Sequence, residues 1–188
     1  MKFNSKWRNQ ITYLDNLYYL AYYLFDFENF RKEKIMARVE LIEELNKALS
    51  LELAGIIQYS QHSYLVTGVE REIYKGFFRD QAEEAQKHAQ FLGDKIVALG
   101  GIPTVEPAMI RQSTDLKVML EQNLELEREA IGIYMSAWKC CDQEDLPTKF
   151  WLEGQIAEEQ LHVEELEKLT SERKSKVNSE RIVLREVS

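Results

Sequence analysis

Apolar residues recur at helical spacing through most of the chain, and this pattern predicts long helices rather than strands. The clearest stretch carries Leu45, Leu49, Glu52, Ile56 and Tyr59, spaced 4, 3, 4 and 3 residues apart. This spacing places all five side chains on the face of a helix that packs into a core. A glutamate on that face needs a reason, because a buried carboxylate loses its hydration.

Turn signals divide the central part of the chain into four predicted helices, over about residues 39–65, 70–99, 115–141 and 148–169. Gly100 and Gly101 end the second helix, and Pro103 follows them. Asp115 and the two residues before it offer N-caps for the third helix. Two short turns and one long middle connection predict an all-α four-helix bundle of two hairpins joined by a crossover.

The composition changes near residue 35, and we expect three segments: an aromatic N-terminal extension (1–35), the bundle (36–170) and a charged tail (171–188). The first 30 residues hold half of the aromatic residues of the chain. The extension is interpreted as an extra helix that docks on the bundle or on a partner. An upstream appendage, with Met36 as the working start, is the alternative.

The two predicted hairpins repeat each other. A shift of 75 residues places five residues of the first helix on identical residues of the third: Leu45 on Leu120, Leu49 on Leu124, Glu52 on Glu127, Ile56 on Ile131 and Tyr59 on Tyr134. The same shift places Glu84 on Glu159, and a histidine follows each, His88 and His162. Packed together, the hairpins would bring four glutamates and two histidines into the core.

Two divalent metal ions explain such a cluster better than protonation does. Four buried carboxylates repel one another, and two divalent cations balance their charge. Carboxylates with one imidazole per metal suit iron or manganese, and zinc less specifically. We predict Glu52, Glu84, His88, Glu127, Glu159 and His162 as metal ligands. Tyr59 and Tyr134 are expected to donate hydrogen bonds to carboxylates near the metals.

The second helix departs from the usual ligand spacing. Glu159 and His162 are three residues apart, as in the Glu-x-x-His motif of carboxylate bundles, whereas Glu84 and His88 are four apart. We favour both as ligands, with a one-residue π-bulge between them. If Ala85 instead occupies the bridging position, the site is defective or mononuclear.

Other residues receive simpler interpretations. His62 is expected to be a core residue or to lie behind the ligands. Cys140 and Cys141 are read as ordinary thiols. The other glutamates of the fourth helix are expected to be solvated; they include Glu153, Glu158, Glu164, Glu165 and Glu167.

Charge and hydropathy exclude some classes of function. A net charge of −8 argues against broad nucleic-acid binding, although residues 31–34 or 173–176 could make local contacts. No apolar stretch is long enough for a transmembrane segment, and a signal peptide fits poorly. We therefore expect a cytoplasmic protein.

At these motifs the sequence resembles the ferritin-like superfamily, especially bacterioferritin and its mini-ferritin-like relatives. The resemblance covers about residues 38–169, including "LNKALSLELAGIIQYSQH", "HAQFLGDKIVALGGIP" and "EEQLHVEELEKL". It implies terminal ligands at Glu52, His88, Glu127 and His162 and bridging ligands at Glu84 and Glu159. Gln86 stands where bacterioferritin has its haem-binding methionine, so no haem is expected.

The resemblance also implies an activity and partners. The family oxidises Fe(II) with O₂ or peroxide and stores the ferric product in a hollow shell, so we expect a ferroxidase with two iron ions per chain in a homo-oligomer. Mn or Zn are possible substitutes for iron. One alternative is a di-metal oxygenase acting on an organic substrate. Another is a structural bundle whose N-terminal extension binds a partner.

Overall fold

The structure is a computed structural model that describes residues 5–142 and 145–171, with side chains from Asp26 onward except Phe27. It contains α1 (Ser5–Leu65), α2 (Arg71–Ala98), α3 (Leu116–Cys140) and α4 (Leu146–Thr170). The described residues form no strand. The tail after Ser171 and the aromatic side chains up to Phe25 lie outside the described residues, so the predictions made for them stay predictions.

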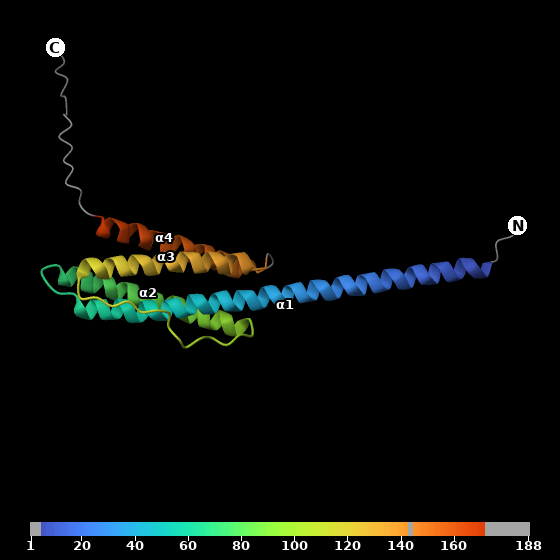
Figure 1. The fold of residues 1–188 in the computed structure, drawn as a ribbon, viewed down its shortest axis with the longest axis horizontal. Coiled ribbons are helices and arrows are strands. Elements are labelled where there is room, and N and C mark those ends of the chain that lie inside the picture. Colours follow the sequence, from blue (N-terminus) through green and yellow to red (C-terminus); the bar gives the residue numbers. More distant parts are fainter. Residues whose placement is uncertain (1–4, 143–144, 172–188) are drawn as a thin grey trace, which may run out of the picture.

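The helices form the predicted bundle of two hairpins. α1 packs against α2, α3 packs against α4, and α1 also packs against α3 (Figure 1). The core is built from the apolar faces of all four helices, including Leu45, Tyr59, Phe78, Leu92, Ile96, Met119, Tyr134, Leu152 and Leu166. The expected all-α architecture is confirmed.

α1 is longer than its apolar pattern predicted. It is one helix of 61 residues, roughly 90 Å at 1.5 Å per residue. Its N-terminal part extends beyond the other helices (Figure 1), and among its described side chains, from Asp26 onward, the first buried one is Leu41. The composition boundary near residue 35 is therefore not a break in the backbone, because residues 31–40 contain neither glycine nor proline.

The crossover between α2 and α3 is fastened to α1 by polar side chains. Asn46 accepts a hydrogen bond from the backbone N–H of Thr104 at 2.7 Å, and the Ser50 hydroxyl donates to the carbonyl of Glu106 at 2.8 Å. Further along, the Gln58 carbonyl oxygen accepts from the backbone N–H of Arg111 at 2.8 Å. These bonds satisfy backbone groups that an extended segment cannot pair by itself.

Two glycines shape the end of α2. Gly100 has a φ of 84°, in the left-handed region that helix ends commonly use. At Gly101 a Cβ atom would lie 2.6 Å from Cγ2 of Ile42, so only glycine lets the chain pass α1 at this point. The hairpin is thereby closed tightly at the end opposite its turn. None of the described helices carries an apolar stretch sufficient to cross a membrane.

Candidate metal centre

Carboxylates and imidazoles from all four helices meet in the middle of the bundle. Glu52 comes from α1, His88 from α2, Glu127 from α3, and Glu159 and His162 from α4. The three glutamates and His88 are buried, at 2–8% exposure, and His162 is half-buried. The helical spacing within the apolar seams places the three glutamates there, as the sequence pattern predicts.

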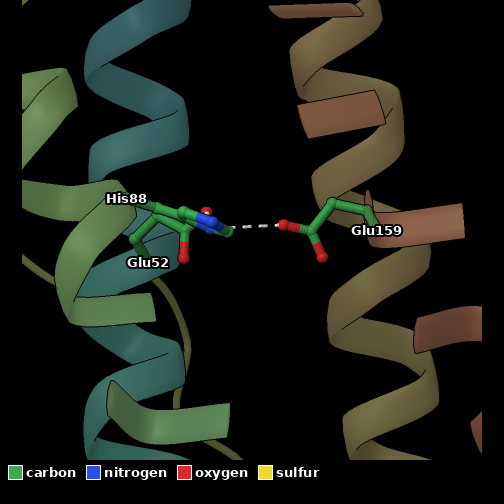
Figure 2. Close-up of side chains that lie close together, drawn as sticks. All are labelled: Glu52, His88 and Glu159. Atoms are coloured by element: carbon green, nitrogen blue, oxygen red, sulfur yellow. Dashed lines mark ion pairs between the residues drawn. The ribbon is translucent and has the colours of Figure 1, made fainter. Parts of the chain in front are cut away.

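Two groups of three potential ligands share Glu159. Glu52, His88 and Glu159 offer ligand atoms within 4.8 Å of one another, and so do Glu127, Glu159 and His162. His88 Nδ1 lies 3.5 Å from Glu52 Oε1 and 3.5 Å from Glu159 Oε1, and Figure 2 shows Glu159 reaching from α4 toward the other two. His162 Nδ1 lies 3.2 Å from the second oxygen of Glu159. Glu159 therefore stands between the two groups.

The two core tyrosines donate hydrogen bonds across the hairpins. Tyr59 of α1 donates to Oε1 of Glu127 on α3, and Tyr134 of α3 donates to Oε1 of Glu52 on α1. Burial raises the pKa of both tyrosines well above the ordinary value, so both hydroxyls keep their protons. Each hydroxyl therefore orients one carboxylate of the opposite hairpin.

Burial and repulsion from Glu159 raise the pKa of the other two buried carboxylates, Glu52 and Glu127. Burial raises the pKa of Glu52, and Glu159 adds to the rise. Burial and the neighbouring Glu159 raise the pKa of Glu127 well above its ordinary range. A cluster in which carboxylates resist ionisation is one that gains from a cation.

Glu159 and His88 shift in opposite directions because they pair with each other. Burial alone would raise the pKa of Glu159, but contacts with His162 and His88 outweigh it and lower the pKa to about 2. Burial alone would lower the pKa of His88, but Glu159 and Glu52 raise it to about 10. In the metal-free protein a protonated imidazole therefore supplies the positive charge that the carboxylates need.

α2 contains no π-bulge between Glu84 and His88, contrary to the expectation from their spacing. α2 is α-helical from Arg71 to Ala98, so its turns place Ala85 three residues before His88, the relation that Glu159 has to His162. Ala85 is buried, and both Ala85 and Glu84 line the cavity among the ligands. Glu84 lies at the rim, where its Oε2 atom is 3.3 Å from His162 Nε2. Ala85, rather than Glu84, thus occupies the inner position, the alternative for which the sequence predicted a defective or mononuclear site.

The structure also brings in Glu158, which the sequence pattern assigned to solvent. Its Oε2 atom lies 3.5 Å from His88 Nε2, and Glu84, His88 and Glu158 form a third cluster within 4.8 Å. A shift of 74 residues, instead of 75, superimposes Glu84 on Glu158 and His88 on His162. The separation of the two histidines, His88 and His162, was the signal for this register.

The remaining candidates lie apart from the three clusters. His62 is fully buried beside Phe78, with ring centroids 5.6 Å apart, and burial lowers its pKa to about 4. It is a neutral core residue one turn beyond Tyr59. Burial raises the pKa of both Cys140 and Cys141, which makes them unreactive thiols near neutral pH.

The donor set fits divalent cations. Three buried carboxylates and two imidazole Nδ1 atoms face one another, and the cavity among them measures about 20 Å³. That volume holds something the size of a water molecule or a metal ion. Carboxylate oxygen with imidazole nitrogen is the ligand chemistry of iron and manganese sites.

Several known proteins are similar to this chain in sequence and in fold. The sequence model of the Ferritin-like domain matches residues 42–174. A bacterioferritin of Brucella melitensis is 34% identical over 134 residues, which cover 68% of this chain and 81% of the relative. Crystals of ferritin-like, diiron-carboxylate proteins from Bacillus anthracis gave a structure with a TM-score of 0.69 and 35% identity, covering 72% of this chain and 98% of that one.

A dodecameric thioferritin, the bacterioferritin-related protein of Bacteroides fragilis, has a TM-score of 0.63 at 27% identity. The similarity covers 73% of this chain and 91% of that one. These matches agree with the expectation of a ferritin-like bundle from the motifs in α1, α2 and α4. The chain belongs to the ferritin-like family and is related to the bacterioferritins within it.

Proposed function

We propose that this protein oxidises Fe(II) to Fe(III), for iron storage or detoxification. The observation that carries the proposal is the pair of three-residue clusters joined through Glu159. Two like clusters with one common carboxylate suit two cations held side by side. The relation to a bacterioferritin and to a diiron-carboxylate protein supports the same conclusion.

Fe(II) is the substrate, and the chain supplies its ligands. Glu52 and His88 would hold one iron, and Glu127 and His162 the other, with Glu159 between them. Two Fe(II) ions together give up two electrons, which reduce O₂ to hydrogen peroxide, or hydrogen peroxide to water. Manganese or zinc could occupy the same ligands.

The protein contributes orientation and charge to this reaction. Tyr59 and Tyr134 fix the carboxylates of Glu127 and Glu52, so these ligands need little rearrangement when a cation arrives. The imidazoles must release protons to bind a metal, and iron uptake is therefore coupled to proton release.

The size of the cavity favours iron over an organic substrate. The space among the ligands is about 20 Å³, too small for an organic molecule beside two metal ions. A cavity of about 520 Å³ lies where α1 leaves the bundle, and its lining includes none of the proposed ligands. A purely structural bundle would leave its buried carboxylates unexplained, because apolar side chains would stabilise the core better.

Family membership also supports an assembled protein, and Gln86 is the reason to propose that it holds no haem. The relative from Bacteroides fragilis is dodecameric, and we infer a homo-oligomer here, in the cytoplasm. Gln86 offers no methionine sulfur to haem, and its side chain is exposed.

Stopped-flow mixing of the metal-free protein with two equivalents of Fe(II) in air tests the activity. We expect a ferric absorbance rise well above the rise in buffer. In Glu159→Gln the initial rate should fall by about tenfold or more, because losing a shared ligand costs at least about 1.4 kcal/mol of binding.

Glu164→Gln is the matched control, since this exposed glutamate lies on the same helix away from the cluster. It should oxidise iron at the parent rate. A parent protein that gives no ferric signal above buffer would refute the proposal.

A further inference from the structure

The side of α1 that packs into the core continues along the part of the helix that extends beyond the bundle. Leu45 and Leu41 are buried on this side. Before them, at alternating intervals of 3 and 4 residues, come Arg38, Lys34, Arg31, Phe27, Leu24, Leu20, Leu17 and Tyr13. Positions with this spacing follow one side of a helix, and α1 is continuous over all of them. We call the positions from Tyr13 to Arg38 the extension seam; its first five are aromatic or aliphatic.

The cavity of about 520 Å³ lies where the extension seam leaves the bundle. Its lining includes Arg31, Lys34 and Arg38 of the seam, Leu99 after α2, and Asp142 and Asp145 between α3 and α4. At this level α2 and α3 end and α4 begins (Figure 1), so none of the described helices covers the seam beyond it. An uncovered apolar seam therefore begins at an open cavity.

We propose that the extension seam pairs with the extension seam of a second copy of this chain in an antiparallel coiled coil, and that the start of α1 of each copy reaches the cavity of the other. The same face on both copies then forms the contact, as in a dimer with twofold symmetry. The inference concerns assembly and does not depend on iron oxidation by the bundle.

The charges on the seam favour the antiparallel direction. In a parallel pair Arg31, Lys34 and Arg38 would each face the same residue of the second copy, and like charges that face each other across an interface repel. In the antiparallel pair Arg31 faces Tyr13, and Lys34 faces Gln10. A guanidinium group against a tyrosine ring is a favourable cation–π contact.

The apolar positions select one register of the antiparallel pair. When Leu20 faces Leu24 and Leu17 faces Phe27, the central layers of the pair contain only apolar side chains from both copies. A shift by one heptad in one direction places Phe27 opposite Gln10. The same shift in the other direction places Leu20 opposite a basic residue of the seam.

The length of the projecting helix agrees with this register. α1 begins at Ser5, and the register places Ser5 of one copy opposite Val39 of the other, next to Arg38 at the cavity. The first turn of a helix carries a partial positive charge, and Asp142 and Asp145 in the lining of the cavity supply carboxylates. The layers of the seam and the length of the helix thus lead independently to the same alignment.

Aromatic residues on and beside the seam give the pair enough contact area. Trp7, Tyr13, Phe27 and Phe30 hold such positions, and Phe30 is 54% exposed in the single chain. At roughly 150 Å² for each aromatic side chain, these residues from both copies would bury about 1,200 Å². Specific interfaces between proteins start at about that area, and the leucines of the seam are still to be added.

Disulfide cross-linking of the full-length chain tests the pairing. Leu20→Cys and Leu24→Cys, co-expressed on separate chains and mildly oxidised, should give a covalent dimer as the main product, because the two positions face each other. Either variant alone should stay at the background of the parent, whose cysteines are Cys140 and Cys141. Co-expressed Leu17→Cys and Leu20→Cys are the matched control, since they face each other only in a register shifted by one heptad.

Light scattering provides a second measurement that needs no oxidation. Leu20→Glu places a charge in the central layers, so the two copies should separate and the particle mass should fall at least by half. Asn29→Glu adds the same charge on the opposite side of the helix and should keep the parent mass. Circular dichroism of both variants checks that the bundle remains folded.

The outcomes separate the possible arrangements. A covalent dimer from Leu20→Cys alone would mean that the two helices run parallel, and cross-linking only in the matched control would mean a different register; either result overturns the inference. Co-expressed Leu20→Cys and Leu24→Cys chains that stay unlinked would mean that the seam contacts another protein or a membrane instead of a second copy. Iron oxidation by the parent is unaffected by these results, so the proposed function fails or stands on its own test.

Discussion

At the scale of single residues, Ala85 is where the two halves of the metal centre differ. Its counterpart in the other hairpin is Glu159, the carboxylate common to both clusters. The inner set therefore holds three carboxylates, whose charge does not balance two divalent cations. We therefore expect the missing fourth carboxylate to make the binding of a second ion the weaker step.

Ala85→Glu should strengthen that step. The new carboxylate would project into the cavity that Ala85 lines and complete a second bridge. We expect the second Co(II) ion to bind about tenfold more tightly, as 1.4 kcal/mol of added interaction implies. Isothermal titration calorimetry of the metal-free protein measures the effect.

Gln86→Glu adds the same charge at the exposed neighbouring position and should leave the affinity unchanged. Equal gains in the two variants would mean that net charge, and not the bridging position, governs binding.

The sequence predicted the two seam glutamates and their tyrosines better than it predicted the second-helix ligands. Glu52 and Glu127 lie within identical patterns of apolar residues, and this pattern places each of them on the core-facing side of its helix. The second and fourth helices each contain two adjacent glutamates. Periodicity alone cannot decide between two alignments of these helices that differ by one residue. Only the packed helices show that Glu84 matches Glu158, because the first hairpin has one more residue between its seam glutamate and its histidine.

At the scale of helices, end signals were more reliable than composition. Asp115 caps α3, with its side chain accepting from the Val118 N–H at 3.1 Å, as its position suggested. α1 runs without a break from the predicted extra helix into the first helix of the bundle, because the change of composition near residue 35 brings no glycine or proline with it.

The N-cap of α4 can be tested by substitution. Asp145 accepts hydrogen bonds from the backbone N–H and hydroxyl of Thr148, at 3.3 and 2.6 Å, and pairs with Lys95 of α2 at 3.1 Å. Asp145→Ala should lower the free energy of unfolding by about 1 kcal/mol. Chemical denaturation at pH 7 measures the loss.

The loss should depend on pH. Burial alone would raise the pKa of Asp145, but the contacts with Thr148 and Lys95 outweigh it and lower the pKa below the ordinary value. The charged form therefore stabilises the fold above the unfolded-state pKa, near 4, and this contribution disappears as the pH falls through the folded-state pKa. A difference between parent and variant that stays constant down to pH 2 would contradict this account.

At the scale of the whole molecule, the N-terminal part of α1 is separate from the bundle that holds the ligands. It extends past the ends of the other helices (Figure 1), and the described side chains of α1 become buried from Leu41 onward. The first proposed ligand, Glu52, lies about three helical turns further on. The geometry of the metal centre therefore does not require the extension.

Removing residues 1–35 should leave the bundle intact and change its assembly. We expect the melting temperature to shift by less than about 4 °C, the effect of roughly 1 kcal/mol in a domain of this size. Co(II) affinity per chain should not change. Light scattering after size-exclusion chromatography should show a different oligomer, because an aromatic helix this long needs a partner surface. An unchanged oligomer would mean that the extension has no role in assembly.

The crossed tyrosines have a consequence for the ancestry of the chain. Tyr59 donates a hydrogen bond to a carboxylate of the second hairpin, and Tyr134 donates one to a carboxylate of the first. Two copies of a single hairpin, placed about a twofold axis, would exchange their hydroxyls in the same way. The reciprocal bonds are thus what a duplicated and fused gene would inherit from a symmetric dimer of half-length chains.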